Sequence, residues 1–77
     1  MKTGFECESQ DELLGIKNSV TECATACSSS ILCRFFIYGT AGWKTGRCYW
    51  EKTDSYNCHE GWQKDVFDFY SVQGMFG

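Results

Sequence analysis

The chain has 77 residues, six of them cysteine, and its ten acidic residues outnumber its seven basic residues to give a net charge of −3. A chain of this length has room for one small hydrophobic core, so we expect a single domain over residues 1–77. The lysines and arginines are scattered, which excludes nucleic acid and anionic membrane surfaces as expected partners. Six cysteines in so short a chain indicate a disulfide scaffold from an oxidising compartment, and therefore an extracellular or secreted protein.

The N-terminal residues 1–15 are polar and acidic, and we interpret them as an extended lead-in. The opening "MKTGFECESQDE" has no apolar segment of the kind found in signal peptides, so we expect no signal peptide in this chain. No apolar run approaches the roughly 18 residues of a membrane span, which predicts no membrane insertion. The sequence fits a mature protein or a module of a larger multidomain chain or assembly.

A capping box marks the start of the first predicted helix, because Ser19 is followed three residues later by Glu22. The helix is expected to run over residues 20–28 and to end at the serines 28–30, which are weak helix formers. Its apolar residues recur at helical spacing as Val20, Cys23, Ala24 and Cys27. This spacing predicts one apolar stripe that faces the core.

The segment "ILCRFFIYG", residues 31–39, is apolar at odd and even positions alike, except for Arg34. That pattern predicts a central strand covered on both faces. A second strand, "RCYWEKT" at residues 47–53, places Cys48 and Trp50 on one face. The two strands are expected to form a hairpin with a long loop.

A third strand is expected at "VFDFYSV", residues 66–72, with Phe67 and Phe69 on the same face. After it comes a short tail, residues 73–77, which contains Met75 and Phe76. One helix and at least three strands therefore predict an α+β fold, with the helix packed on an antiparallel sheet.

The cysteine spacing restricts the disulfide pairing. Cys23 and Cys27 lie one helical turn apart, about 5–6 Å between their Cβ atoms, which is too far for a disulfide. Cys33 is close enough to bridge Cys27 across the serine turn, and Cys48 faces the side of the sheet on which the helix can pack. The other two cysteines then pair with each other, although their positions constrain them least. The favoured bridges are Cys7–Cys58, Cys23–Cys48 and Cys27–Cys33.

Metal and redox sites fit the cysteine pattern less well. Zinc ligands usually arrive as two close pairs of residues, whereas Cys23, Cys27, Cys33 and the Cys58–His59 pair offer one such spacing. A redox site needs a CxxC motif near a helix N-terminus, and a CxxxC stripe on a buried helix face does not supply it. We therefore expect no metal and no cofactor.

Catalytic residues are equally hard to assign. The single histidine, His59, lies in a polar loop beside a cysteine that we expect to be disulfide-bonded. Asp65 and Asp68 are spaced as an acid and base pair, but exposed positions on an edge strand explain both. We therefore expect no enzyme and no catalytic residues.

Trp43 is the strongest candidate for a binding residue, because it lies in the hairpin loop with Lys44 and Arg47. Exposed tryptophan beside cations is a usual contact for sugar rings or protein partners. The alternative is that Trp43 folds back over the sheet. Trp62 fits either an exposed or a buried position.

A small basic patch is a further possibility for ligand binding, suited to sulfated glycans. Lys44 and Arg47 would form it together with Lys52 and Lys64. Solvation of a charged surface explains the same residues equally well. Trp50, which shares the Cys48 face, is expected in the core.

The helix with a CxxxC motif, the cysteine that opens the aromatic strand "CRFFIYG", and the return through "GRCYWEKT" resemble the PAN/apple domain family. The resemblance is closest over residues 19–53. It implies a small disulfide-rich PAN/apple-like fold, in which two core bridges map onto Cys23–Cys48 and Cys27–Cys33. The apple branch of the family adds a bridge between the N-terminal and C-terminal strands, but Cys58 precedes the expected last strand, so Cys7–Cys58 departs from that pattern.

The family resemblance also implies a function. It predicts a non-catalytic extracellular recognition module that binds a protein or carbohydrate partner, as in cell adhesion. The alternative is a structural subunit that stabilises a larger assembly or filament. These two readings differ in whether the isolated domain binds a ligand or only other parts of its own assembly.

Overall fold

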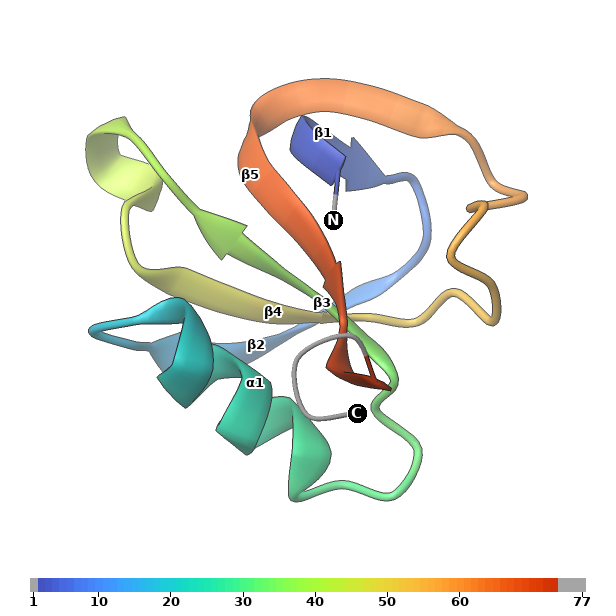
Figure 1. The fold of residues 1–77 in the computed structure, drawn as a ribbon. Coiled ribbons are helices and arrows are strands. Elements are labelled where there is room, and N and C mark those ends of the chain that lie inside the picture. The colour runs from blue at the N-terminus through green and yellow to red at the C-terminus, as the bar shows by residue number, and fades with distance from the viewer. Residues whose placement is uncertain (1, 74–77) are drawn as a thin grey trace.

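The computed structural model describes residues 2–73 of the chain, as one helix packed on a five-stranded antiparallel sheet (Figure 1). In chain order the elements are β1 (Lys2–Cys7), β2 (Asp11–Ile16), α1 (Val20–Ser28), β3 (Phe35–Gly39), the 3-10 helix η1 (Gly42–Lys44), β4 (Arg47–Glu51) and β5 (Trp62–Ser71). The strand order is β1-β5-β3-β4-β2. The predicted fold class is confirmed, and the tail residues Met75 and Phe76 lie outside the described residues.

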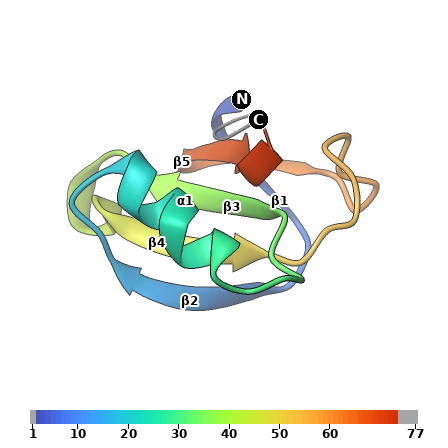
Figure 2. The same cartoon turned by 60° about the horizontal axis from the view of Figure 1, so that its bottom comes forward.

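Helix α1 covers the predicted residues and uses the predicted cap. The Ser19 hydroxyl accepts a hydrogen bond from the Glu22 backbone N–H at 3.1 Å. The Glu22 carboxylate in turn accepts from the backbone N–H of Asn18 at 3.1 Å, one residue before the cap residue. Two N–H groups at the start of the helix are thereby satisfied, and the stripe containing Cys23 and Cys27 is buried. Figure 2 shows α1 lying against one face of the sheet.

Strand β3 lies at the centre of the sheet and is buried on both faces, as its apolar sequence predicts. Its alternating side chains enter two separate cores. The core under α1 contains Cys23, Ala24, Cys27, Cys33, Phe36 and Cys48. The core on the opposite face contains Cys7, Phe35, Ile37, Cys58, Phe67 and Phe69.

The start of β3 differs from the prediction. The strand begins at Phe35, whereas Ile31 and Leu32 lie in the preceding loop and are 95% and 72% exposed. The loop is closed by the Cys27–Cys33 disulfide, and the Cys33 N–H donates to the Ser30 carbonyl in a turn. The short bridge therefore keeps the chain in a turn where the apolar pattern alone predicts an extended strand.

The predicted extended lead-in, whose strand content the sequence leaves open, contains β1 and most of β2. These strands lie at opposite edges of the sheet. Strand β1 pairs with β5, which begins at Trp62 rather than at residue 66, and both strands curve over the sheet (Figure 1). The curvature brings the Trp62 ring to 4.8 Å from the ring of Phe69. The β1–β5 ribbon thus covers part of the core opposite α1.

The three predicted disulfides are all present, as Cys7–Cys58, Cys23–Cys48 and Cys27–Cys33. Each of the six cysteines is at most 5% exposed. Two bridges lie in the core under α1, and the third lies in the opposite core. Each core beside β3 therefore contains at least one covalent link between the segments that form it.

A buried carboxylate at the end of β4 connects β4 to β1, a strand with which it does not pair in the sheet. Glu51 is fully buried and accepts a hydrogen bond from the Cys7 backbone N–H at 2.7 Å. The Ser9 hydroxyl donates to the other carboxylate oxygen at 3.2 Å. Because a buried polar group without a partner is costly, these two bonds fix the connection between β1 and β2 against β4.

The end of β3 requires glycine. A Cβ atom built on Gly39 would collide with the backbone carbonyl of Lys44, where the hairpin loop folds back. The Gly39 carbonyl also accepts from the Gly46 N–H at 3.0 Å, which closes the loop. The position of Lys44 therefore depends on the missing side chain at Gly39.

We expect Gly39→Ala to lower the free energy of unfolding by about 2–3 kcal/mol, because the added methyl group forces a backbone shift in a packed site. Gly42→Ala is the matched control, because its Cβ would meet open space and only its φ of 62° opposes substitution. That strain costs about 1 kcal/mol. Denaturant unfolding with the disulfides intact measures the free energy of unfolding of both variants. Equal losses in the two would contradict the close approach of Gly39 to the Lys44 backbone.

Removal of the outer disulfide should destabilise the domain more than removal of the short one. The Cys7–Cys58 bridge has a sequence separation of 51 residues and the Cys27–Cys33 bridge one of 6. Loop-closure entropy then predicts losses of about 4 and about 2 kcal/mol for the two double Cys→Ala variants. All four cysteines are similarly buried, so the lost packing is comparable. Thermal unfolding of the two variants measures the order, and the reverse order would refute this account.

Candidate functional site

The hairpin loop between β3 and β4 presents Trp43 to solvent. Trp43 lies in η1 and is 75% exposed, so its ring does not fold back over the sheet. The Arg47 guanidinium carbon lies 5.3 Å from the Trp43 ring centroid and 5.6 Å from that of Tyr49. Arg47 Nε also donates to the Tyr49 hydroxyl at 2.9 Å. The guanidinium is thereby held in contact with two aromatic rings.

Lys44 is fixed beside the same tryptophan by an ion pair. Its Nζ lies 2.9 Å from each carboxylate oxygen of Asp65 on β5. The same Nζ lies 5.3 Å from the ring centroid of Trp43 and 5.4 Å from that of Phe67. Asp65 therefore anchors the hairpin loop to β5 and neutralises the charge of Lys44.

Two aliphatic side chains of β2 lie next to these residues. Leu13 pairs across the sheet with Tyr49, and Ile16 pairs with Arg47. Directly opposite residues of antiparallel strands point to the same face, so both side chains lie on the face opposite α1. Leu13 is 51% exposed and Ile16 is 63% exposed. We call the surface formed by Leu13, Ile16, Trp43, Lys44, Arg47 and Tyr49 the hairpin surface.

The sequence identified part of this surface. Trp43, Lys44 and Arg47 come together as the hairpin loop predicts, whereas Leu13 and Ile16 were not recognised. The two aliphatic residues lie in a segment interpreted as a lead-in, and only the pairing of β2 with β4 brings them beside Arg47. A run of two leucines followed by an isoleucine was the available signal for a strand there.

The other predicted binding residues lie elsewhere. Trp62 is half-buried, packs edge-on against Phe69, and has Lys2 Nζ at 4.9 Å from its ring centroid. Lys52 Nζ lies 4.7 Å from the Trp50 ring and forms an ion pair with Glu12 at 3.2 Å. Trp50 itself packs against the core under α1. The predicted basic patch therefore does not form around Lys52, and the hairpin surface contains two cations.

Lys64 is exposed on β5, directly across from Phe5 of β1. No ion pair within residues 2–73 joins it to the hairpin surface. The structure therefore gives Lys64 no part in that surface.

The predicted edge position of Asp65 and Asp68 is wrong, because β5 lies between β1 and β3. Both aspartates are partly buried, and each has a structural partner. Asp65 binds Lys44, and Asp68 accepts a hydrogen bond from the Gly4 backbone N–H at 3.0 Å. The two aspartates bind different partners, Lys44 and Gly4, so their carboxylates do not form a pair.

His59 lies in the loop between β4 and β5, where its side chain is 71% exposed. Its Nε2 is 3.7 Å from a carboxylate oxygen of Asp54, which is itself 83% exposed. An exposed pair of this kind is weakly held in water. The position agrees with the solvated loop imidazole that the sequence predicts.

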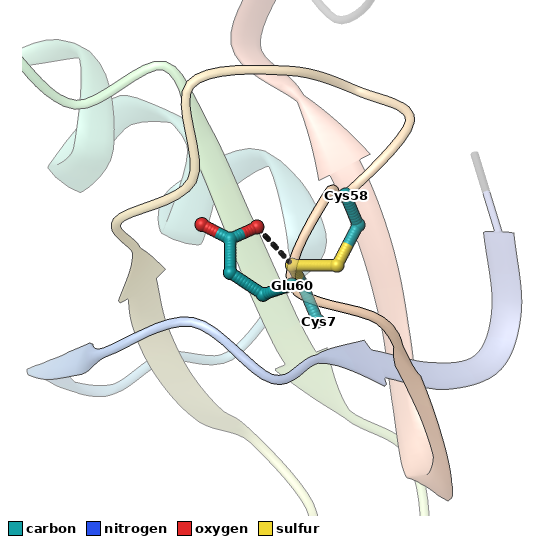
Figure 3. A group of neighbouring side chains, drawn as sticks. All are labelled: Cys7, Cys58 and Glu60. Carbon is teal, nitrogen blue, oxygen red and sulfur yellow. Dashed lines mark hydrogen bonds between the residues drawn. A yellow bond between two sulfur atoms is a disulfide. The ribbon is translucent and has the colours of Figure 1, made fainter.

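A group of potential metal ligands lies at the outer disulfide. The ligand atoms of Cys7, Cys58 and Glu60 are within 4.8 Å of one another, and Figure 3 shows the Glu60 carboxylate directed at the Cys7 sulfur. Glu60 Oε1 lies 3.5 Å from that sulfur. Both sulfurs are engaged in the disulfide, so neither is a thiolate that would bind zinc. The arrangement does not fit a metal site.

A second carboxylate lies near the ion pair of the hairpin surface. Burial raises the pKa of Glu6 to about 7, and the carboxylates of Asp65 and Asp11 add to this rise, whereas Lys44 opposes it. Hydrogen bonds from Lys44 hold the pKa of Asp65 below its usual value. Glu6 therefore takes up a proton near neutral pH while Asp65 stays ionised.

The fold and its bridges define a class: a helix on a five-stranded antiparallel sheet, with three disulfides, has the architecture of a PAN/apple fold. The PAN domain profile matches residues 3–74, and the chain belongs to the PAN domain family. Comparisons with curated proteins and with solved structures gave no significant match.

Membership of this family has general implications for function. PAN domains are typically protein- or carbohydrate-binding modules and are generally non-catalytic. Three disulfides together with a PAN domain suggest an oxidising, extracellular location. Among the helices of residues 2–73, none is long and apolar enough to cross a membrane.

We expect Glu6→Gln to stabilise the protein near pH 8 but not near pH 4. A carboxyl whose pKa is raised by folding contributes stability below its unfolded pKa of 4.5 and loses it as pH rises through about 7. Glutamine cannot ionise and avoids this loss. The effect should be small because solvent screens a partly exposed group. Melting temperatures at both pH values measure it, and a stabilisation that is equal at both would contradict the raised pKa.

Proposed function

We propose that this PAN domain recognises a protein partner through the hairpin surface. The observation that carries the proposal is the 75% exposure of Trp43, on a loop whose neighbouring side chains are fixed. Tryptophan and arginine are the residues most often found at the energetic centre of protein interfaces. Both occur here in direct contact.

The aliphatic residues favour a protein over a carbohydrate. Leu13 and Ile16 extend the exposed apolar area beside Arg47, on the same face of the sheet. Sugar rings stack well on an aromatic ring such as Trp43, whereas branched aliphatic side chains are more typical of the apolar centre of a protein interface. A partner with apolar side chains would cover all three residues together, as the centre of a protein interface does.

The fixed geometry of the surface reduces the cost of binding. Arg47 is held by two aromatic rings and one hydrogen bond, and Lys44 is held by both oxygens of Asp65. Side chains that are already ordered lose little conformational entropy when a partner binds. The hairpin surface is therefore organised before binding.

The proposal predicts that peptides selected against the domain will depend on Trp43. Random peptides displayed on phage would be selected on the immobilised protein, and a glycan array would be probed in parallel. Trp43→Ala should weaken binding of the selected peptides about 30-fold or more, as loss of an interface centre does.

The matched control is Ile31→Ala, which removes an exposed apolar side chain from a different loop and should leave peptide binding unchanged. Retained amide dispersion in the NMR spectrum would show that both variants are folded. Binding that survives Trp43→Ala, or that is lost in Ile31→Ala, would place the recognition surface elsewhere. Glycan binding without peptide binding would exclude the protein partner.

A further inference from the structure

Within the described residues, 2–73, Arg47 has no carboxylate partner, unlike the other cations near the hairpin surface. Lys44 is paired with Asp65 and Lys52 with Glu12. Within residues 2–73, no ion pair involves Arg47, although its side chain is half-buried. A half-buried cation that lacks a counterion is a natural place for an anionic group of a ligand.

The geometry of Arg47 determines which anion fits. Its Nε–H is engaged by the Tyr49 hydroxyl, so the two terminal NH₂ groups are the donors left for a ligand. Such a planar pair of donors matches the two oxygens of a carboxylate. Arg47 is half-buried beside the rings of Trp43 and Tyr49, and a hydrogen bond made by a partly desolvated guanidinium is stronger than one made in water.

The surroundings of Arg47 favour a carboxylate of a protein over a sulfated glycan. Sulfated glycans bind clusters of several cations, but here the charge of Lys44 is neutralised by Asp65. Within residues 2–73, Arg47 is therefore the one cation of the hairpin surface that has no ion-pair partner. Ile16 is paired with Arg47 across the sheet and offers an apolar contact to a side chain adjacent to the carboxylate.

We infer that Arg47 receives an aspartate or glutamate carboxylate of the protein partner, next to an apolar side chain that contacts Ile16 and Leu13. This inference rests on the proposed function of the hairpin surface and specifies the chemistry of its ligand. It assigns different tasks to neighbouring residues. Trp43, Ile16 and Leu13 supply apolar area, and Arg47 supplies the charged contact that selects an acidic residue.

The test uses two blocked dipeptides that differ in one group. The ¹⁵N-labelled full chain would be titrated with N-acetyl-glutamyl-leucinamide and with N-acetyl-glutaminyl-leucinamide. The signals followed are the Arg47 Nε–H and the Trp43 indole N–H. We expect the glutamyl peptide to shift both signals and the glutaminyl peptide to bind about 10-fold more weakly, because it lacks the charge-assisted pair.

Variants of the protein separate charge from geometry. Arg47→Gln should abolish the preference for the glutamyl peptide, and Arg47→Lys should retain only part of it, because lysine keeps the charge without the planar pair of donors. Lys52→Gln is the matched control. It removes one positive charge from a lysine that contacts Trp50 and Glu12, and it should leave the preference intact.

The outcomes distinguish this inference from the proposed function. Equal binding of both dipeptides with a shifted Trp43 signal would overturn the carboxylate assignment and leave the hairpin surface as a binding site. No shift with either dipeptide would also overturn the assignment. Tighter binding of a heparin-derived disaccharide, lost in Arg47→Gln, would show that sulfate is the natural anion. The dipeptide comparison requires no substitution, so it stands even if an Arg47 variant does not fold.

Discussion

Burial of β3 on both faces is the constraint on which the rest of the structure depends. A strand of five residues with apolar side chains on each side needs two covers, and a chain of 77 residues has little material for them. Helix α1 supplies one cover, and the β1–β5 ribbon with the β4–β5 loop supplies the other. Both cores are small, and the disulfides that lie in them add stability that apolar burial alone would not supply. The molecule is thus held together on two sides of one strand.

The same strand positions the hairpin surface. Gly39 at its end allows the loop to fold back so that the Lys44 backbone lies against Gly39, and the Lys44 side chain reaches Asp65 on the neighbouring strand. Trp43, next to Lys44 in the loop, is 75% exposed, and Arg47 is oriented by Tyr49 within β4. A surface for recognition is therefore built at the rim of the core, with its polar side chains anchored in the sheet.

The sequence predicted the structural features that depend on residues close together in the chain. Most of the features that it did not predict depend on pairing between distant strands. The capping box at Ser19 located α1, and the helical spacing of the cysteines restricted the disulfide pairing. The sequence indicates an extended segment at β1 and β2 but leaves its strand content open, because short strands at sheet edges carry little apolar periodicity. Leu13 and Ile16 could join the predicted Trp43 site only through the register of β2 on β4. The buried Glu51 was equally invisible, because its partners lie far away in the sequence.

The nested arrangement of the disulfides determines how the domain responds to cleavage of its backbone by a protease. The Cys7–Cys58 bridge encloses the other two, so residues 7–58 form a covalently closed ring. A single cut within that ring opens the ring but separates no fragment from the molecule. The exposed Ile31 lies inside the smallest ring, where the Cys27–Cys33 bridge would also hold the cut ends together. A nicked domain could therefore retain both cores and its hairpin surface, whereas reduction of the bridges would release the pieces.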